Sequence, residues 1–98
     1  MPAYLMSTDP ESGYNDLDAM AGYGATVPGI VESFGGRYLL RRSQTRALEG
    51  SWEPGDMVLI EFPSMTELRA FYESEQYRPW LELRQRAGRT NIVITEAA

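Results

Sequence analysis

The sequence contains no cysteine, histidine or lysine, and each absence excludes a class of chemistry. Without cysteine, the chain cannot form a disulfide, a thiolate zinc site or a cysteine nucleophile. Without histidine, it lacks the commonest general base and the commonest nitrogen ligand of metals. Without lysine, no side chain can form a Schiff base, and all nine cationic residues are arginines. Any reaction therefore depends on carboxylates, hydroxyls, amides, arginines, the amino terminus or a bound cofactor.

The charge and hydropathy of the chain limit its partners. A net charge of −5 disfavours non-specific nucleic-acid binding, which depends on neutralising phosphates, so no nucleic-acid partner is expected. The longest apolar runs are about four residues, against the roughly 20 that a membrane helix needs, so no membrane partner is expected. Residues 1–4 lack the basic and apolar regions of a signal peptide. We therefore expect a soluble cytoplasmic protein with a single domain spanning residues 1–98.

Four segments have the residue patterns of β-strands. Strands are predicted over residues 3–8, 37–48, 57–62 and 91–95. Regular alternation along the second of these places Arg41 on the same face as Arg37. The third is almost continuously apolar, which is typical of a strand covered on both faces.

The connection between the first two strands has a helical pattern. The helix is predicted to start at Asn15 or Asp16, with Asp9 as an alternative cap. Pro28 removes a backbone donor, so we expect one irregular helix or two short ones. The helix is expected to end at residues 35–36, because glycine readily takes the left-handed conformation after a helix.

The connection between the third and fourth strands begins with a capping box. The Ser64 hydroxyl can accept a hydrogen bond from the backbone N–H of Glu67, while the Glu67 side chain reaches back. Residues 77–79 are expected to break the helix, and Pro79 suits the first turn of a second helical piece. Gly88 is the predicted end of that piece.

The resulting order of elements is β-α-β-β-α-β. Two interleaved right-handed β-α-β units form an α+β, ferredoxin-like fold, with a four-stranded antiparallel sheet and the helices on one face. The third strand needs cover on both sides, yet no residues remain to cover the second face. A second copy of the chain is the simplest cover, so the sequence predicts a homodimer.

Five segments spread along the chain resemble a known bacterial family, DUF1330. They are GGRYL at 35–39, LEGSW at 48–52, VLIEFPS at 58–64, AFYESEQYRP at 70–79 and LR at 83–84. The family belongs to the dimeric α+β-barrel superfamily, together with antibiotic-biosynthesis monooxygenases, muconolactone isomerases and YCII-like proteins. The resemblance implies a small-molecule pocket between sheet and helices in each subunit of a homodimer.

The resemblance carries no settled reaction, because the family is named for its unknown function. Several superfamily members act on polyketides, aromatics or lactones without a metal or an organic cofactor, so no cofactor is expected. The first 25 residues depart from the family pattern, and the mouth of the pocket is expected to differ accordingly. No pair of carboxylates in the sequence has recognisable metal-binding spacing, so no metal site is expected.

Glu61 is the candidate catalytic residue. It is an acid within an apolar strand, and burial would raise the pKa of its carboxyl towards values that suit a general base. The alternative is a structural or ligand-binding role, with Glu61 in a buried ion pair with Arg37 or Arg84. Ion-pair networks also perturb pKa values, so both interpretations stay open.

Arginines and tyrosines are the candidate substrate-binding residues. Arg37 and Arg84 can each bind a carboxylate or enolate through two parallel donors. Tyr72 and Tyr77 flank the break before the second helical piece, and a tyrosine can pack its ring while its hydroxyl donates to a ligand. Tyr4 is a candidate on the same grounds. The alternatives are an acidic neighbour for Arg37 and ordinary core packing for the tyrosines.

Two functions follow from these residues and the resemblance. The first is a homodimer that binds a small organic anion, with cofactor-independent isomerisation, cyclisation or oxygenation of an enolisable, aromatic or polyketide-type substrate. Glu61 would then be the base, and an arginine would stabilise the enolate. The second is a non-catalytic ligand-binding or accessory dimer module. Trp52 suits a lid or a dimer contact, because tryptophan is enriched at interfaces.

Overall fold

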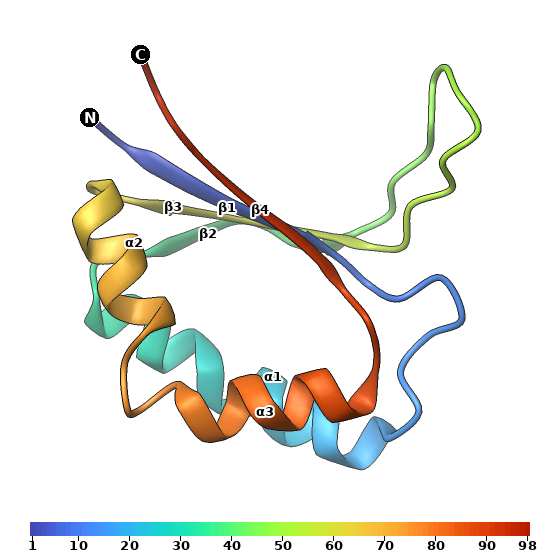
Figure 1. Ribbon diagram of the computed structural model, residues 1–98, viewed down its shortest axis with the longest axis horizontal. Coiled ribbons are helices and arrows are strands. Elements are labelled where there is room, and N and C mark those ends of the chain that lie inside the picture. The colour runs from blue at the N-terminus through green and yellow to red at the C-terminus, as the bar shows by residue number, and fades with distance from the viewer.

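The helices and strands follow one another in the predicted order. The computed structural model describes all 98 residues. The elements are β1 (Ala3–Thr8), α1 (Leu17–Ser33), β2 (Arg37–Ser43), β3 (Met57–Phe62), α2 (Met65–Tyr72), α3 (Arg78–Ala87) and β4 (Asn91–Glu96) (Figure 1). No helix among them has the length and apolar character needed to cross a membrane.

The four strands form one antiparallel sheet in the order β2-β3-β1-β4. The two central strands, β1 and β3, are not neighbours in sequence, as expected when two β-α-β units interleave. All three helices lie on the same face of the sheet (Figure 1). The predicted α+β ferredoxin-like fold is confirmed.

The core lies between the central strands and the helices. Alternate residues of β3, Ile60 and Phe62, are buried against the helical layer, as are Ala3 and Leu5 of β1. The Phe62 ring stacks on Phe71 of α2, with ring centroids 5.6 Å apart. Burial of these apolar side chains holds the helical layer on the sheet.

The first helix is continuous across its proline. Asp16 caps α1 by accepting a hydrogen bond from the backbone N–H of Ala19 at 3.0 Å, which confirms the later of the two predicted starts. Pro28 lies inside the helix and does not split it. Gly35 then ends the helix with a φ of 84°, as predicted.

The second helical connection consists of two helices. Ser64 caps α2 through the backbone N–H of Glu67 and also bonds the Glu67 carboxylate. The helix ends at Tyr72, earlier than the predicted break at residues 77–79. The Ser74 hydroxyl donates to the carbonyl of Phe71 and accepts from the backbone N–H of Tyr77, so it joins the two helices. The predicted proline stands in the first turn of α3.

The second strand is shorter and less regular than the sequence predicts. It ends at Ser43, where a strand to residue 48 was expected. The pairing with β3 shifts register twice, between Tyr38 and Leu40 and again between Leu40 and Ser43. Each shift is a bulge that changes which face the following side chains occupy. The expectation that Arg41 shares a face with Arg37 is therefore wrong.

The face of the sheet opposite the helices is uncovered. Cross-strand pairing aligns Leu40 with Leu59, Leu59 with Met6, and Met6 with Val93, so one apolar row crosses all four strands. We call this surface the open face. No helix of the chain lies on this face of the sheet (Figure 1).

Two glycine substitutions should change stability in opposite directions. A Cβ at Gly36 would lie 2.6 Å from Val31 Cγ1 and 2.8 Å from Phe62 Cε1, both in fully buried residues, whereas a Cβ at Gly29 of α1 would meet nothing. Gly36→Ala is expected to lower the free energy of unfolding by about 1–3 kcal/mol. Gly29→Ala is expected to raise it by about 0.5–1 kcal/mol through helix propensity. Urea denaturation measures both, and a tolerated Gly36→Ala would contradict the packing described.

Candidate functional site

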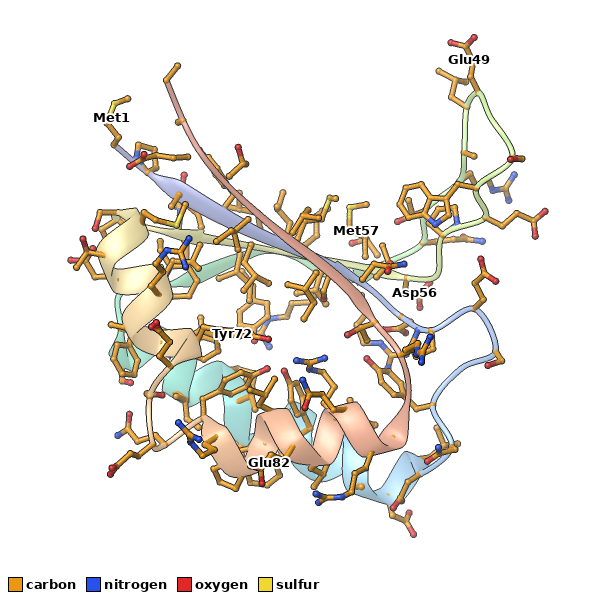
Figure 2. The ribbon with its side chains drawn as sticks, viewed as in Figure 1. Met1, Glu49, Asp56, Met57, Tyr72 and Glu82 are labelled. Carbon is orange, nitrogen blue, oxygen red and sulfur yellow. The ribbon has the colours of Figure 1, made fainter.

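A cavity of about 250 Å³ lies between the sheet and the helices α1 and α3. Its walls are mostly apolar, and Val27, Ile60 and Phe71 contribute to them. Five tyrosines also line it: Tyr14, Tyr23, Tyr38, Tyr72 and Tyr77. Figure 2 shows Tyr72 at the end of α2, between the sheet and the helical layer. A largely apolar cavity with a few polar groups is the usual form of a small-molecule site.

Arg84 is a buried cation in the wall of this cavity. It comes from α3, and only 6% of the residue is exposed. Its Nη1 donates a hydrogen bond to Thr90 Oγ1 at 2.6 Å, while Nε and Nη2 are buried without any partner. Burial lowers the pKa of Arg84, but the neighbouring Tyr77 and Tyr23 hydroxyls outweigh it, and the net direction is upward. Arg84 therefore offers a positive charge without an acidic partner, beside the hydroxyls of Tyr77 and Tyr23.

Two tyrosine hydroxyls meet beside Arg84. The oxygens of Tyr23 and Tyr77 are 2.6 Å apart, and Tyr77 is almost fully buried. Burial, followed by the neighbouring Tyr77, raises the pKa of Tyr23, which keeps that hydroxyl protonated. Because one hydroxyl must donate to the other, the pair retains one O–H proton for a ligand.

Arg41 lies at the exposed side of the cavity. The bulges of β2 turn this side chain to the cavity, and its guanidinium lies over the ring of Tyr38, 4.7 Å from the ring centroid. Burial raises the pKa of Tyr38 to about 12, so its ring is uncharged at neutral pH. Arg41 takes part in neither of the two salt bridges of the structure.

The one acidic residue in the cavity wall, Asp9, is held in an ion pair. Its carboxylate accepts hydrogen bonds from Nε and Nη2 of Arg42, which raises the pKa of Arg42. The backbone N–H of Asp9 also donates to the carbonyl of Asp56 at 2.9 Å. Tyr14 lies nearby, and burial, with a smaller contribution from Asp9, raises its pKa to about 12. Both the carboxylate and the backbone N–H of Asp9 are therefore already hydrogen-bonded within the protein.

Glu61 lies outside the cavity, on the open face. Its neighbours Ile60 and Phe62 point to the helices, so strand alternation directs Glu61 the other way. Arg37 Nε lies 2.7 Å from Glu61 Oε1, and the Tyr4 hydroxyl donates to Oε2 at 3.1 Å. The hydrogen bond from Arg37, and then that from Tyr4, lowers the pKa of the carboxyl. The expectation of a raised pKa in a pocket is therefore wrong.

The six predicted site residues thus separate into two clusters. Tyr72, Tyr77 and Arg84 line the cavity. Glu61, Arg37 and Tyr4 form the second cluster on the opposite face of the sheet. The predicted alternative of an ion pair between Glu61 and Arg37 is present, but the pair lies at the surface and is not buried.

Sequence reasoning missed several cavity residues, chiefly Arg41, Arg42, Asp9, Tyr14 and Tyr38. The polar, arginine-rich end of the second predicted strand was a signal for the two arginines. Nowhere do three or more acidic side chains gather closely enough to hold a metal ion.

Comparisons with known proteins identify the fold and a family. The model of the family described as "Domain of unknown function (DUF1330)" matches residues 2–98. A search of curated proteins finds no match.

Solved structures with the same fold are similar over almost the whole chain. A protein of unknown function from Rhodopseudomonas palustris has a TM-score of 0.77 at 17% identity, covering 99% of this chain and 82% of that one. A dimeric ferredoxin-like protein of unknown function from a Jannaschia species has a TM-score of 0.71 at 17% identity, covering 99% and 100%. A protein from Mycobacterium tuberculosis has a TM-score of 0.57 at 15% identity, covering 100% and 96%. At these identities the likeness shows the fold alone.

Replacing Arg84 should reveal that it is not present for stability. Arg84→Met removes a buried charge with two unpaired N–H groups and keeps an apolar side chain of similar length. We expect a free energy of unfolding that is equal to that of the wild type or up to about 2 kcal/mol higher. Arg86→Met, at an exposed position of the same helix, is the control and should change stability by less than about 0.5 kcal/mol. A large loss for Arg84→Met in urea denaturation would instead make Arg84 a structural residue.

Proposed function

This chain belongs to the DUF1330 family, and we propose that it is a homodimer that binds one small organic anion in the cavity of each subunit. The observation that supports this proposal is the burial of the Arg84 guanidinium without an acidic partner. Buried polar groups in folded proteins are nearly always hydrogen-bonded, and buried charges are nearly always paired. Arg84 is a buried cation without a carboxylate partner, so an anionic ligand is the partner that its surroundings lack.

The donor geometry favours a carboxylate or an enolate. Nε and Nη2 are the two partnerless atoms of Arg84, and a guanidinium edge binds a carboxylate through two parallel hydrogen bonds. The hydroxyl pair of Tyr23 and Tyr77 adds a neutral donor beside it. Both donor types stabilise negative charge on oxygen, and neither requires a metal or a cofactor.

The size and walls of the cavity favour a ligand with an apolar body. An apolar cavity of about 150 Å³ holds a benzene molecule. The present cavity, of about 250 Å³, has room for one ring with substituents. Its aromatic walls suit a flat or aromatic body, since aromatic rings pair edge to face or offset. The ligand class is therefore a small aromatic or similarly apolar organic acid.

The open face supports the homodimer. Its apolar row of Leu40, Leu59, Met6 and Val93 has no cover within one subunit. The loop of residues 44–56 projects on the same side of the sheet, away from the helices (Figure 1), and carries the exposed side chains of Leu48 and Trp52. The similar Jannaschia protein is described as dimeric. Two copies packed face to face would cover the apolar row of each.

Catalysis on an enolisable substrate is the second candidate function. Arg84 and the hydroxyl pair are the kind of donors that stabilise an enolate, which favours isomerase, cyclase or monooxygenase chemistry. Proton abstraction needs a base within reach of the substrate. Glu61 lies across the sheet, and Asp9 is bound to Arg42. The cavity thus has donors that can bind an anion but no free carboxylate that could act as the base. This favours the ligand-binding module over the enzyme.

Binding of an aromatic carboxylate tests the ligand class. Benzoate is expected to bind at least about tenfold more tightly than benzamide, its neutral counterpart, because only the carboxylate forms charge-assisted hydrogen bonds with Arg84. Arg84→Gln should remove this preference. The exposed Arg86→Gln is the matched control and should retain it. Isothermal titration calorimetry measures all four affinities, and circular dichroism verifies the fold of the variants.

Two outcomes would overturn this proposal. One is the absence of benzoate binding by the wild type, and the other is equal binding of benzoate and benzamide.

Disruption of the open face tests the homodimer. Met6→Glu places a charge in the middle of the apolar row, where it would be buried without a partner in a face-to-face dimer. Sedimentation velocity at micromolar concentration should give a dimer for the wild type and a monomer for this variant. Leu17→Glu, at an exposed position of α1, should remain dimeric. A monomeric wild type would refute the homodimer.

A further inference from the structure

We propose that the ligand is a dianion, with one anionic group on Arg84 and a second on Arg41 at the rim of the same cavity. The inference rests on the proposed binding of an organic anion and adds to it the number of charges and their placement.

The charges that line the cavity do not balance. Three arginines and one acidic residue contribute to its walls. The acidic residue, Asp9, is paired with Arg42. Arg41 and Arg84 have no acidic partner, so the cavity carries two uncompensated positive charges in a chain whose net charge is −5. A monoanionic ligand would neutralise only one of them.

The backbone of β2 is distorted in a way that places Arg41 at the cavity. In a regular strand, Arg41 would share the open face with Arg37. The second register shift leaves Arg41 and Arg42 opposite Val58, whose side chain lines the cavity. Arg42 has a φ of 52°, a conformation that is uncommon for a bulky residue and costs about 1–2 kcal/mol. Bulges and strained residues of this kind concentrate at ligand sites, where they redirect side chains.

The guanidinium of Arg41 is held so that its donors remain available. Its Cζ lies over the Tyr38 ring, 4.7 Å from the centroid. This cation–π contact uses no N–H group, so the N–H donors can still bind a carboxylate through two hydrogen bonds. Asp9 engages Arg42 and leaves Arg41 free. Arg41 is thus a positioned cation with no partner in the protein.

The two cations come from different layers of the fold, which bears on the shape of the ligand. Arg84 is buried and comes from α3 in the helical layer, whereas Arg41 is exposed and comes from β2 in the sheet. The apolar wall residues lie in the same cavity. We therefore expect two anionic groups at opposite ends of a compact apolar body.

Terephthalate is a suitable probe, because it is benzoate with a second carboxylate at the opposite ring position. The wild type should bind terephthalate about tenfold more tightly than benzoate. Arg41→Gln should bind the two compounds within about twofold of each other. The matched control is Arg46→Gln, an exposed arginine of the loop after β2 that does not line the cavity. It should keep the wild-type preference.

The salt dependence of binding distinguishes the exposed carboxylate site at Arg41 from the buried one at Arg84. The preference for terephthalate depends on an exposed cation and should fall as sodium chloride is raised, because salt screens exposed charges more than buried ones. Calorimetry at low and high salt measures this change.

The outcomes distinguish the inference of a dianion from the proposal of an organic-anion site, on which it rests. If benzoate and terephthalate bind equally well, the dianion is wrong and the organic-anion site stands. If Arg41→Gln keeps the preference for terephthalate, the assignment of the second group to Arg41 is wrong. If neither compound binds the wild type, the organic-anion site itself fails, and the dianion with it.

Discussion

The alternation of side chains along β3 determines how the rest of this protein is arranged. Ile60 and Phe62 point to the helices and join the core, and Glu61 between them must point to the other face. All three helices lie on one side of the sheet (Figure 1). The molecule therefore has two separate surfaces of interest, namely a cavity between the sheet and the helices, and an open face with an apolar row and a polar cluster.

The cavity combines features that would be unfavourable in a purely structural core. Arg84 is buried with two donors that have no partner, and the tyrosine hydroxyl pair lies beside it. At the rim, Arg42 has a strained backbone and Arg41 has no acidic neighbour. The unpartnered buried donors of Arg84 and the strained backbone of Arg42 both cost stability, and an anion bound at Arg84 would satisfy those donors. Their concentration in one cavity is what gives the binding proposal its strength.

Much of the fold could be predicted from local signals. The helix caps at Asp16 and Ser64, the left-handed Gly35 and the proline at the start of α3 all act within a few residues of themselves. The candidate site was harder to predict, and it was predicted in part. Arg84, Tyr72 and Tyr77 do line the cavity.

Glu61 was expected to be buried because its strand is apolar throughout. An apolar strand requires cover on both faces, but it does not say which face receives helices and which receives a second subunit. The order of elements, the caps, the uncovered sheet face and the absence of cysteine, histidine and lysine chemistry follow from the sequence by itself, since each depends on residue types and local spacing. Only the tertiary structure decides which charges meet. The two bulges in β2 and the one-sided helical layer arise from packing between distant segments, and they bring Arg41 to the cavity of Arg84 while they leave Glu61 outside it.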